Sequence, residues 1–141
     1  WVSSDFGDNG TYLTFRLETL PCVTKYSITS GNDFEGRDPA EWTLSGSSDG
    51  TTWEVLDHPS GVEFSKRQET MEFGISFSKH YNWFRFDFLE VRDLESGGNM
   101  LQFSTIAFYT GKCDSAAPVP PPARQHSCSS LYLTDLSDML K

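Results

Sequence analysis

The segment "YNWFRFDFLEV", residues 81–91, alternates bulky apolar side chains with polar ones at every second position. Phe84, Phe86 and Phe88 fall on one side of this segment, and Arg85 and Asp87 fall on the other. Successive side chains of a β-strand point to opposite faces of its sheet, so a period of two is typical of a strand with one buried face. The segment therefore predicts a strand with three phenylalanines in the core.

The same rhythm recurs on both sides of this segment. Turn residues separate the repeats, and Asp49-Gly50 is the clearest of these turns, because glycine adopts a positive φ without steric cost. Helical periodicity is nearly absent from residues 1–112. Many short strands separated by turns predict an all-β sandwich. The other predicted strands are residues 11–17, 22–30, 41–47, 52–56, 71–77 and 101–109.

Length and composition fit one domain with an ordinary core. The chain has 141 residues, of which 14% are aromatic, so it buries enough apolar surface to fold. Its formal net charge of −9 argues against binding to nucleic acid or to an anionic membrane surface. The chain also lacks an apolar run as long as a membrane span.

The composition changes near Asp114, where a Pro- and Ser-rich segment begins. We therefore expect a sandwich domain at residues 1–113 and a tail at residues 114–141, made of a Pro-rich linker and a short amphipathic terminal segment. Leu133, Leu136 and Leu140 form one apolar stripe if that terminal segment is helical. We expect the tail to dock through them on its own domain or on a partner.

The chain has three cysteines: Cys22, Cys113 and Cys128. An odd, sparse set does not indicate a disulfide framework, and its spacing fits no zinc motif. Cys22 lies in an apolar, strand-like run and is predicted to be a buried thiol, whereas Cys113 or Cys128 could pair with a cysteine outside this chain. The cysteines therefore do not decide whether the protein resides in an oxidising or a reducing compartment.

The segment "TSGNDFEGRDPAEWTLSGSSDGTTWEVL", residues 29–56, followed by "YNWFRFDF" and "LQFSTIAFYTG", resembles the discoidin-like (coagulation-factor type C) domain. That domain belongs to the galactose-binding-like superfamily, which includes carbohydrate-binding modules. The resemblance covers residues 1–113 and implies a jelly-roll β-sandwich. It rests on Trp1, Asn32-Asp33, Arg37-Asp38-Pro39, Ser48-Asp49-Gly50, Trp53, Phe84-Arg85-Phe86 and Leu101-Gln102-Phe103-Ser104.

The chain departs from the family pattern in two ways. Thr105 stands where the family usually has a glutamate. The family also has one or two strands and a calcium-prone loop before the residue that matches Trp1, and these lie outside this chain. The resemblance therefore implies a sandwich whose first strands come from a preceding segment or from another chain.

The polar loop before Trp42 has a structural and a functional interpretation. In the first, its Asn and Asp side chains build turns, and Arg37 holds the loop by bonding a carboxylate or carbonyls. In the second, the loop contributes to a sugar site, for which the candidate residues are Phe34, Arg37, His58 and His80. The resemblance also implies a structural Ca²⁺, with Asp33 and Asp38 as candidate ligands, and no other cofactor.

Nothing in the sequence indicates an enzyme. His58, His80 and His126 lie outside any motif with a nucleophile, and glycine-rich phosphate loops are absent. Asn9 begins a glycosylation sequon. Trp83 lies opposite the phenylalanine face and is the candidate aromatic for contact with a partner or the tail.

These observations lead to two hypotheses of function. The first is a non-catalytic binding module that recognises carbohydrate or a cell surface, as the resemblance implies. The alternative is a structural subunit that binds protein partners through the sandwich and the tail in a larger complex. The compartment is not fixed by the sequence, although the resemblance leans toward an extracellular or cell-surface location.

Overall fold

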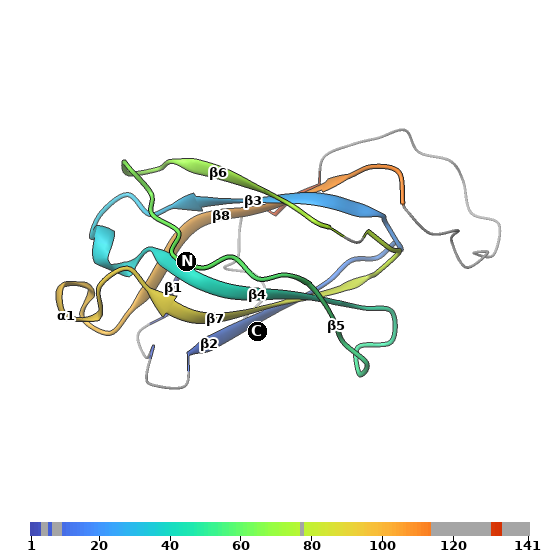
Figure 1. The fold of residues 1–141 in the computed structure, drawn as a ribbon, viewed down its shortest axis with the longest axis horizontal. Coiled ribbons are helices and arrows are strands. Elements are labelled where there is room, and N and C mark those ends of the chain that lie inside the picture. The colour runs from blue at the N-terminus through green and yellow to red at the C-terminus, as the bar shows by residue number, and fades with distance from the viewer. Residues whose placement is uncertain (4–5, 7–9, 77, 114–130, 134–141) are drawn as a thin grey trace.

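A computed structural model describes residues 1–3, 6, 10–76, 78–113 and 131–133 of the chain. Two antiparallel sheets lie face to face, one above the other in Figure 1. The prediction of an all-β, jelly-roll sandwich is confirmed. Two short helical turns, η1 (Glu35–Arg37) and α1 (Leu94–Gly97), lie in the connections between strands.

The first sheet is built around β8 (Leu101–Thr110) and β3 (Val23–Ser30), which pair along most of their length. At the far edge of β3 lies β6 (Thr70–Gly74). The other edge of β8 pairs with β1 (Val2–Ser3) near its start and with β9 (Leu131–Leu133) farther along.

The second sheet has the order β2-β7-β4-β5. Its central strands are β7 (Trp83–Val91) and β4 (Pro39–Ser47), flanked by β2 (Thr11–Arg16) and β5 (Glu54–Asp57). Each of the seven predicted strands is present, and the largest difference is that β6 ends at residue 74 where the sequence predicted 77.

Alternating side chains of the two sheets fill the core. Phe84, Phe86 and Phe88 of β7 are fully buried, as predicted, and the Phe86 and Phe88 rings stack with centroids 5.8 Å apart. Phe108 from the facing sheet packs on Phe84 with ring centroids 4.8 Å apart. Such aromatic pairs add stability beyond the area that they bury.

The polar atoms of the buried aromatics have partners. Trp42 Nε1 donates to the Tyr26 hydroxyl over 2.8 Å, and this hydroxyl donates to Asp57 Oδ2 over 2.8 Å. Burial, reinforced by the Asp57 carboxylate, raises the pKa of Tyr26 above its ordinary value, so this hydroxyl remains a donor. The network joins both sheets through satisfied hydrogen bonds.

The connections gather at two ends of the sandwich. The α1 end comprises residues 31–38, 58–69 and 92–100, and the disulfide end comprises residues 17–22, 48–53 and 78–82 together with residues 111–113. The two ends lie at opposite sides of Figure 1, with α1 at the left and the β4–β5 turn at the right. At this turn Asp49 Oδ1 accepts from the Thr51 and Thr52 backbone N–H groups, and Gly50 has a φ of 76°.

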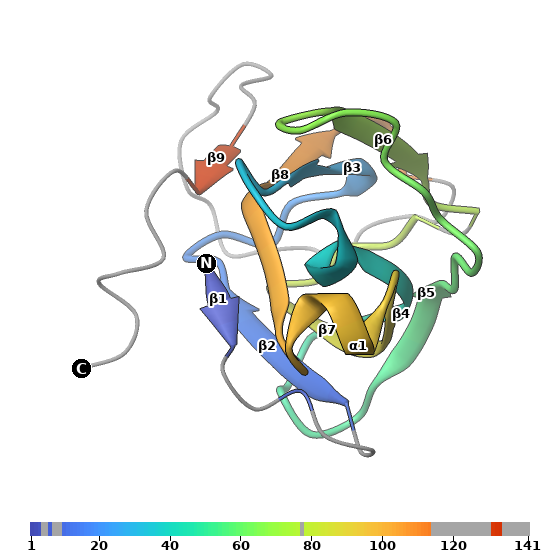
Figure 2. The same cartoon turned by 90° about the vertical axis from the view of Figure 1, so that its left-hand side faces the viewer.

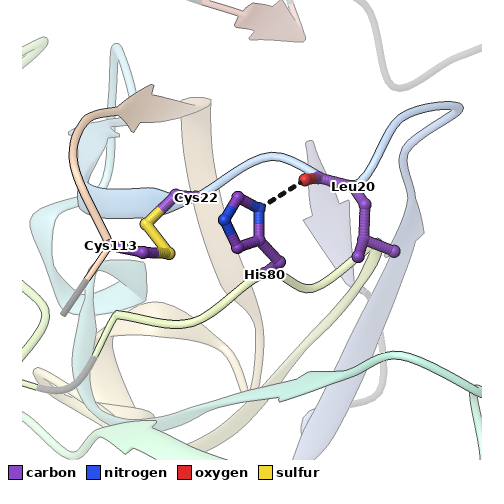
Figure 3. Close-up of a disulfide and its surroundings, with 4 residues drawn as sticks. All are labelled: Leu20, Cys22, His80 and Cys113. Atoms are coloured by element: carbon purple, nitrogen blue, oxygen red, sulfur yellow. Dashed lines mark hydrogen bonds between the residues drawn. A yellow bond between two sulfur atoms is a disulfide. The ribbon is translucent and has the colours of Figure 1, made fainter. Parts of the chain in front are cut away.

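The prediction of a buried Cys22 thiol is wrong. Cys22 forms a disulfide with Cys113, although the two are 91 residues apart in sequence (Figure 3). β3 begins opposite the last residues of β8, because Val23 pairs with Thr110, and this register brings the two Cα atoms to 5.6 Å. The bond therefore joins the two central strands of the first sheet at one end.

The tail contributes β9, which pairs with β8 from Ile106 to Phe108. The prediction of a helical leucine stripe is wrong for Leu133, because that residue lies in a strand. Leu136 and Leu140 lie outside the described residues. Within the described ranges, no helix has both the length and the apolar character needed to cross a bilayer.

Replacing Phe86 by alanine tests the core. The side chain is fully buried between the sheets, so Phe86→Ala should lower the free energy of unfolding by about 3–5 kcal/mol. The measurement is urea unfolding followed by tryptophan fluorescence. Tyr12→Ala serves as the control. Because Tyr12 is 60% exposed, its replacement should lower the free energy of unfolding far less. Similar unfolding midpoints for the two variants would contradict this packing.

Removing the disulfide should destabilise the fold measurably. The bond closes a chain segment of 91 residues, so Cys22→Ala/Cys113→Ala should lose about 2–5 kcal/mol of unfolding free energy. Thermal unfolding of the oxidised wild type, the reduced wild type and the double variant checks this. The last two should agree, and an unfolding temperature of the double variant equal to that of oxidised wild type would refute the assignment.

Candidate functional site

Three connections meet at the α1 end and hold one another through backbone hydrogen bonds. The Arg92 N–H donates to the Asp38 carbonyl, and the Asp93 N–H donates to the Gly36 carbonyl, each over 2.9 Å. Gly36 is buried, and a Cβ there would lie 2.9 Å from the Gly97 nitrogen, so only glycine allows this approach. Figure 2 shows the teal turn of η1 directly beside α1.

An ion pair fastens the connection of residues 58–69 to the connection of residues 31–38. The Asp38 carboxylate is 1% exposed, and both of its oxygens accept hydrogen bonds from the Arg67 guanidinium. The same guanidinium donates to the Asp33 carbonyl over 3.2 Å. These hydrogen bonds to Asp38 raise the pKa of Arg67 above its ordinary value. The bidentate geometry fixes the orientation of the loop as well as its position.

Phe34 projects from this fixed frame. Its side chain is 56% exposed, and its φ of 36° is a conformation that bulky residues rarely adopt. The Arg37 guanidinium carbon lies 4.1 Å from the Phe34 ring centroid, and Arg37 Nε donates to the Gly97 carbonyl over 2.9 Å. Backbone strain at an exposed aromatic residue, held in place by surrounding contacts, is characteristic of ligand sites.

Two amide side chains lie at this end of the sandwich, Asn32 on the loop of Phe34 and Gln102 on β8. Gln102 Nε2 donates to Asn32 Oδ1 over 3.4 Å. Gln102 Oε1 is buried without a hydrogen-bond partner among the described residues. We name the exposed surface formed by Asn32, Phe34, Arg37 and Gln102 the loop site. It combines an aromatic ring with planar polar groups, which suits recognition of a ligand that has both an apolar face and several hydroxyls.

The structure brings together two of the four predicted sugar-binding residues, Phe34 and Arg37. His58 lies beyond β5, where its Nε2 is 2.9 Å from Glu41 Oε1. His80 lies at the opposite end of the sandwich, where its Nδ1 donates to the Leu20 carbonyl over 2.8 Å (Figure 3). The single four-residue cluster is therefore wrong, because β6 runs from the α1 end to the disulfide end and carries His80 away.

The two predicted calcium ligands, Asp33 and Asp38, both bond the Arg67 guanidinium. Asp38 is engaged by Arg67, and the carbonyl of Asp33 accepts from the same guanidinium, whose charge opposes a cation there. Across the described residues, no group of three or more His, Cys, Asp or Glu could hold a metal ion. The calcium role of both aspartates remains a prediction.

The other predicted site residues lie elsewhere. Trp83 is half-buried on the outer face of β7, opposite the phenylalanines, with the Arg16 guanidinium carbon 5.3 Å from its ring centroid. Asn9 is outside the described residues. Sequence reasoning missed Arg67, because "SKRQE", residues 65–69, has the composition of an ordinary charged loop and does not reveal a partner 29 residues away.

Comparison with known proteins gives one sequence relative and several structural ones. No family model matches the chain. Over 107 residues it is 41% identical to a peptide-N(4)-(N-acetyl-beta-glucosaminyl)asparagine amidase of Arabidopsis thaliana. The alignment covers 73% of this chain, which spans only 15% of the length of that relative.

Two solved structures have the same architecture. One is CBM32-1 of a family 31 glycoside hydrolase from Clostridium perfringens, with a TM-score of 0.61, 15% identity and coverage of 77% of this chain and 75% of that chain. The other is an F5/8 type C domain from Bacteroides fragilis, with a TM-score of 0.63, 16% identity and coverage of 78% and 72%. The chain therefore has the discoidin-like, galactose-binding-like fold of the F5/8 type C and CBM32 domains.

Proposed function

We propose that this chain is a non-catalytic carbohydrate-binding module and that the loop site binds the glycan. Its fold is that of carbohydrate-binding modules. His58 contacts the Glu41 carboxylate, and His80 donates to the Leu20 carbonyl, so both rings make structural contacts. The alternative of a structural subunit gains no support from these comparisons.

The observation that carries the proposal is the exposed Phe34 ring, held from one side by Arg37. The guanidinium lies 4.1 Å from the ring centroid, and the Gly97 carbonyl orients it. The side chain remains 56% exposed, so a ligand can still reach the ring. A sugar ring has an apolar face of C–H groups, and its burial on an aromatic ring contributes free energy in proportion to the apolar area removed from water.

Polar groups around this ring supply the hydrogen bonds that orient a sugar. Asn32 and Gln102 carry amides, which donate and accept, and Arg37 donates through the guanidinium nitrogens that Gly97 does not occupy. The Arg67–Asp38 ion pair holds the loop rigid before the ligand arrives, which lowers the entropy cost of binding.

Our choice of glycan class draws on the name of the sequence relative. Its name describes an amidase that acts on N-acetyl-β-glucosaminyl asparagine, which is the linkage of an N-glycan to protein. A binding module in such a protein would hold the glycan or glycoprotein while a separate domain performs the chemistry. We therefore assign asparagine-linked glycans as the ligand class of the loop site.

Variants of Phe34 test this assignment. The wild-type chain should bind a free oligosaccharide released from an N-glycoprotein, measured by titration calorimetry at up to millimolar sugar. Phe34→Ala should weaken binding by about tenfold or more, because the loss of about 1.4 kcal/mol of contact free energy is a factor of ten. Phe34→Trp should retain binding, because it keeps an aromatic face.

His58→Ala is the matched control. His58 is an exposed residue of the same half of the sandwich, and its ring contacts Glu41. Removing this ring should leave the affinity for the oligosaccharide unchanged. Absence of binding by the wild type at millimolar oligosaccharide would refute the proposal. Equal affinity of Phe34→Ala and wild type would refute the loop site.

A further inference from the structure

A hollow of about 370 Å³ opens at the disulfide end, lined by Arg16, Leu17, Glu18 and Asn82. This volume lies within the range of small-molecule sites, roughly 300–1,000 Å³. We name it the terminal hollow. The nine residues of β7 lie between it and the loop site, which at about 3.3 Å per residue is a separation of roughly 30 Å. It is therefore distinct from the site described above.

The walls of the terminal hollow are fixed by backbone contacts. The Leu17 N–H donates to the Asn82 carbonyl over 2.7 Å, and the Asn82 N–H donates to the Ser47 carbonyl over 3.3 Å. These two bonds join the segment after β2 to the segment before β7 and to the end of β4. The backbone of Asn82 is therefore held on both sides.

The segment that carries Leu17 and Glu18 is also fastened at its other end. Figure 3 shows His80 donating through Nδ1 to the Leu20 carbonyl, beside the disulfide between Cys22 and Cys113. The hollow is thus pre-formed, because both ends of its loop are tied to neighbouring strands. Pre-formed sites lose less conformational entropy when a ligand binds.

Arg16 lines this hollow and forms no ion pair with any of the residues that the structure describes. Its side chain is exposed, and its recorded contact in the described structure is with the Trp83 ring, at 5.3 Å from the centroid. Arg85, which lies two positions after Trp83 on the same face of β7, provides a contrast. The Arg85 guanidinium carbon lies 4.3 Å from the Tyr12 ring centroid. Arg85 Nε and Nη2 donate to Asp87 Oδ1 over 2.9 and 2.6 Å. The guanidinium of Arg16 therefore keeps its donors available for a ligand.

The remaining lining groups complete a neutral polar set. Asn82 Oδ1 is buried without a hydrogen-bond partner among the described residues. Glu18 brings a carboxylate whose charge offsets that of Arg16. A guanidinium, a carboxylate and an amide beside an indole can donate to and accept from adjacent hydroxyls without favouring a charged ligand.

From these contacts we infer that the terminal hollow is a second site for a neutral saccharide and that the module is bivalent. The choice of saccharide as ligand class rests on the proposed function. Two sites roughly 30 Å apart at opposite ends of one rigid sandwich cannot contact the same monosaccharide. They would engage different branches of one glycan or two neighbouring glycans, and simultaneous engagement would raise avidity above the affinity of either site.

The experiment is a titration of the full chain with the free oligosaccharide, followed by the indole N–H resonance of Trp83 in NMR spectra. Trp83→Phe identifies that resonance. The resonance should shift in wild type and in Phe34→Ala, because the terminal hollow does not depend on the loop site. Arg16→Ala should weaken the response at the terminal hollow by about tenfold or more, since hydrogen bonds to charged groups are among the stronger ones. This response is followed through the resonances of the residues that line the hollow.

Arg85→Ala is the matched control, because it removes an arginine with the same kind of aromatic contact from the same face of the sheet, on the neighbouring strand β7. It should leave the titration of the Trp83 resonance unchanged. A Trp83 resonance that stays fixed at saturating oligosaccharide while the Phe34 region shifts would overturn this inference and leave the proposed function intact. Equal weakening by Arg85→Ala and Arg16→Ala would also overturn it. A shift at Trp83 without any at Phe34 would uphold the second site and refute the loop site.

Discussion

The packing of the three β7 phenylalanines against the opposite sheet is the contact on which the rest of the structure depends. β7 is a central strand, with β2 on one side and β4 on the other, so its inward side chains determine how far apart the two sheets lie. Phe84, Phe86 and Phe88 are fully buried, and Phe108 of β8 packs against this row. The segment before β7 contributes Asn82 to the terminal hollow, and the segment after β7 holds Arg37 of the loop site through the Gly97 carbonyl. The same strand that fixes the core therefore fixes the separation of the loop site and the terminal hollow.

The core does not by itself order the connections, and different interactions hold them at the two ends of the sandwich. At the α1 end, polar contacts hold the loops: Asp38 and Arg67 form a buried bidentate pair, and Gly36 allows close approach to Gly97. At the disulfide end, a covalent bond between Cys22 and Cys113 and the contact of His80 with Leu20 hold them. An ion pair tolerates small adjustments of geometry, whereas a disulfide fixes the distance between two backbones. Noncovalent contacts thus hold the loop site, whereas at the end of the terminal hollow a covalent bond adds to the hydrogen bonds.

The strands were predictable because they obey a local rule. A period of two is visible within each segment, so residues 83–91 and 101–110 could be recognised without knowledge of what they pack against. The disulfide was not predictable in the same way, because the closeness of Cys22 and Cys113 follows from the register of β3 on β8. The count of three cysteines also pointed away from a pair.

The candidate sites show the same division between local and long-range information. Phe34 and Arg37 are three residues apart on one turn, so the sequence could suggest their contact. Arg67 and Gln102 contact this loop although they are far from it in sequence. His80 lies at the opposite end of the sandwich, because the direction of a strand decides the end at which the following residues lie. Trp83 could be identified as the outward aromatic from alternation alone. Its proximity to Arg16 required the pairing of β2 with β7.

The charge of the chain constrains what either site can hold. A formal net charge of −9 produces a negative field that repels anionic ligands over distances of about a Debye length, roughly 8 Å at physiological ionic strength. Arg37 at the loop site and Arg16 at the terminal hollow would by themselves favour anions. Glu18 lines the terminal hollow together with Arg16, and at the α1 end Arg67 is already paired with Asp38. The charge of Arg16 is therefore offset within its own hollow, and Arg37 and Arg16 serve as directional donors in a chain that is negative as a whole. A neutral, hydroxyl-rich ligand can use directional donors fully and is least affected by the negative field, and this supports our proposal of a neutral glycan, rather than a phosphorylated or carboxylated one, for both sites.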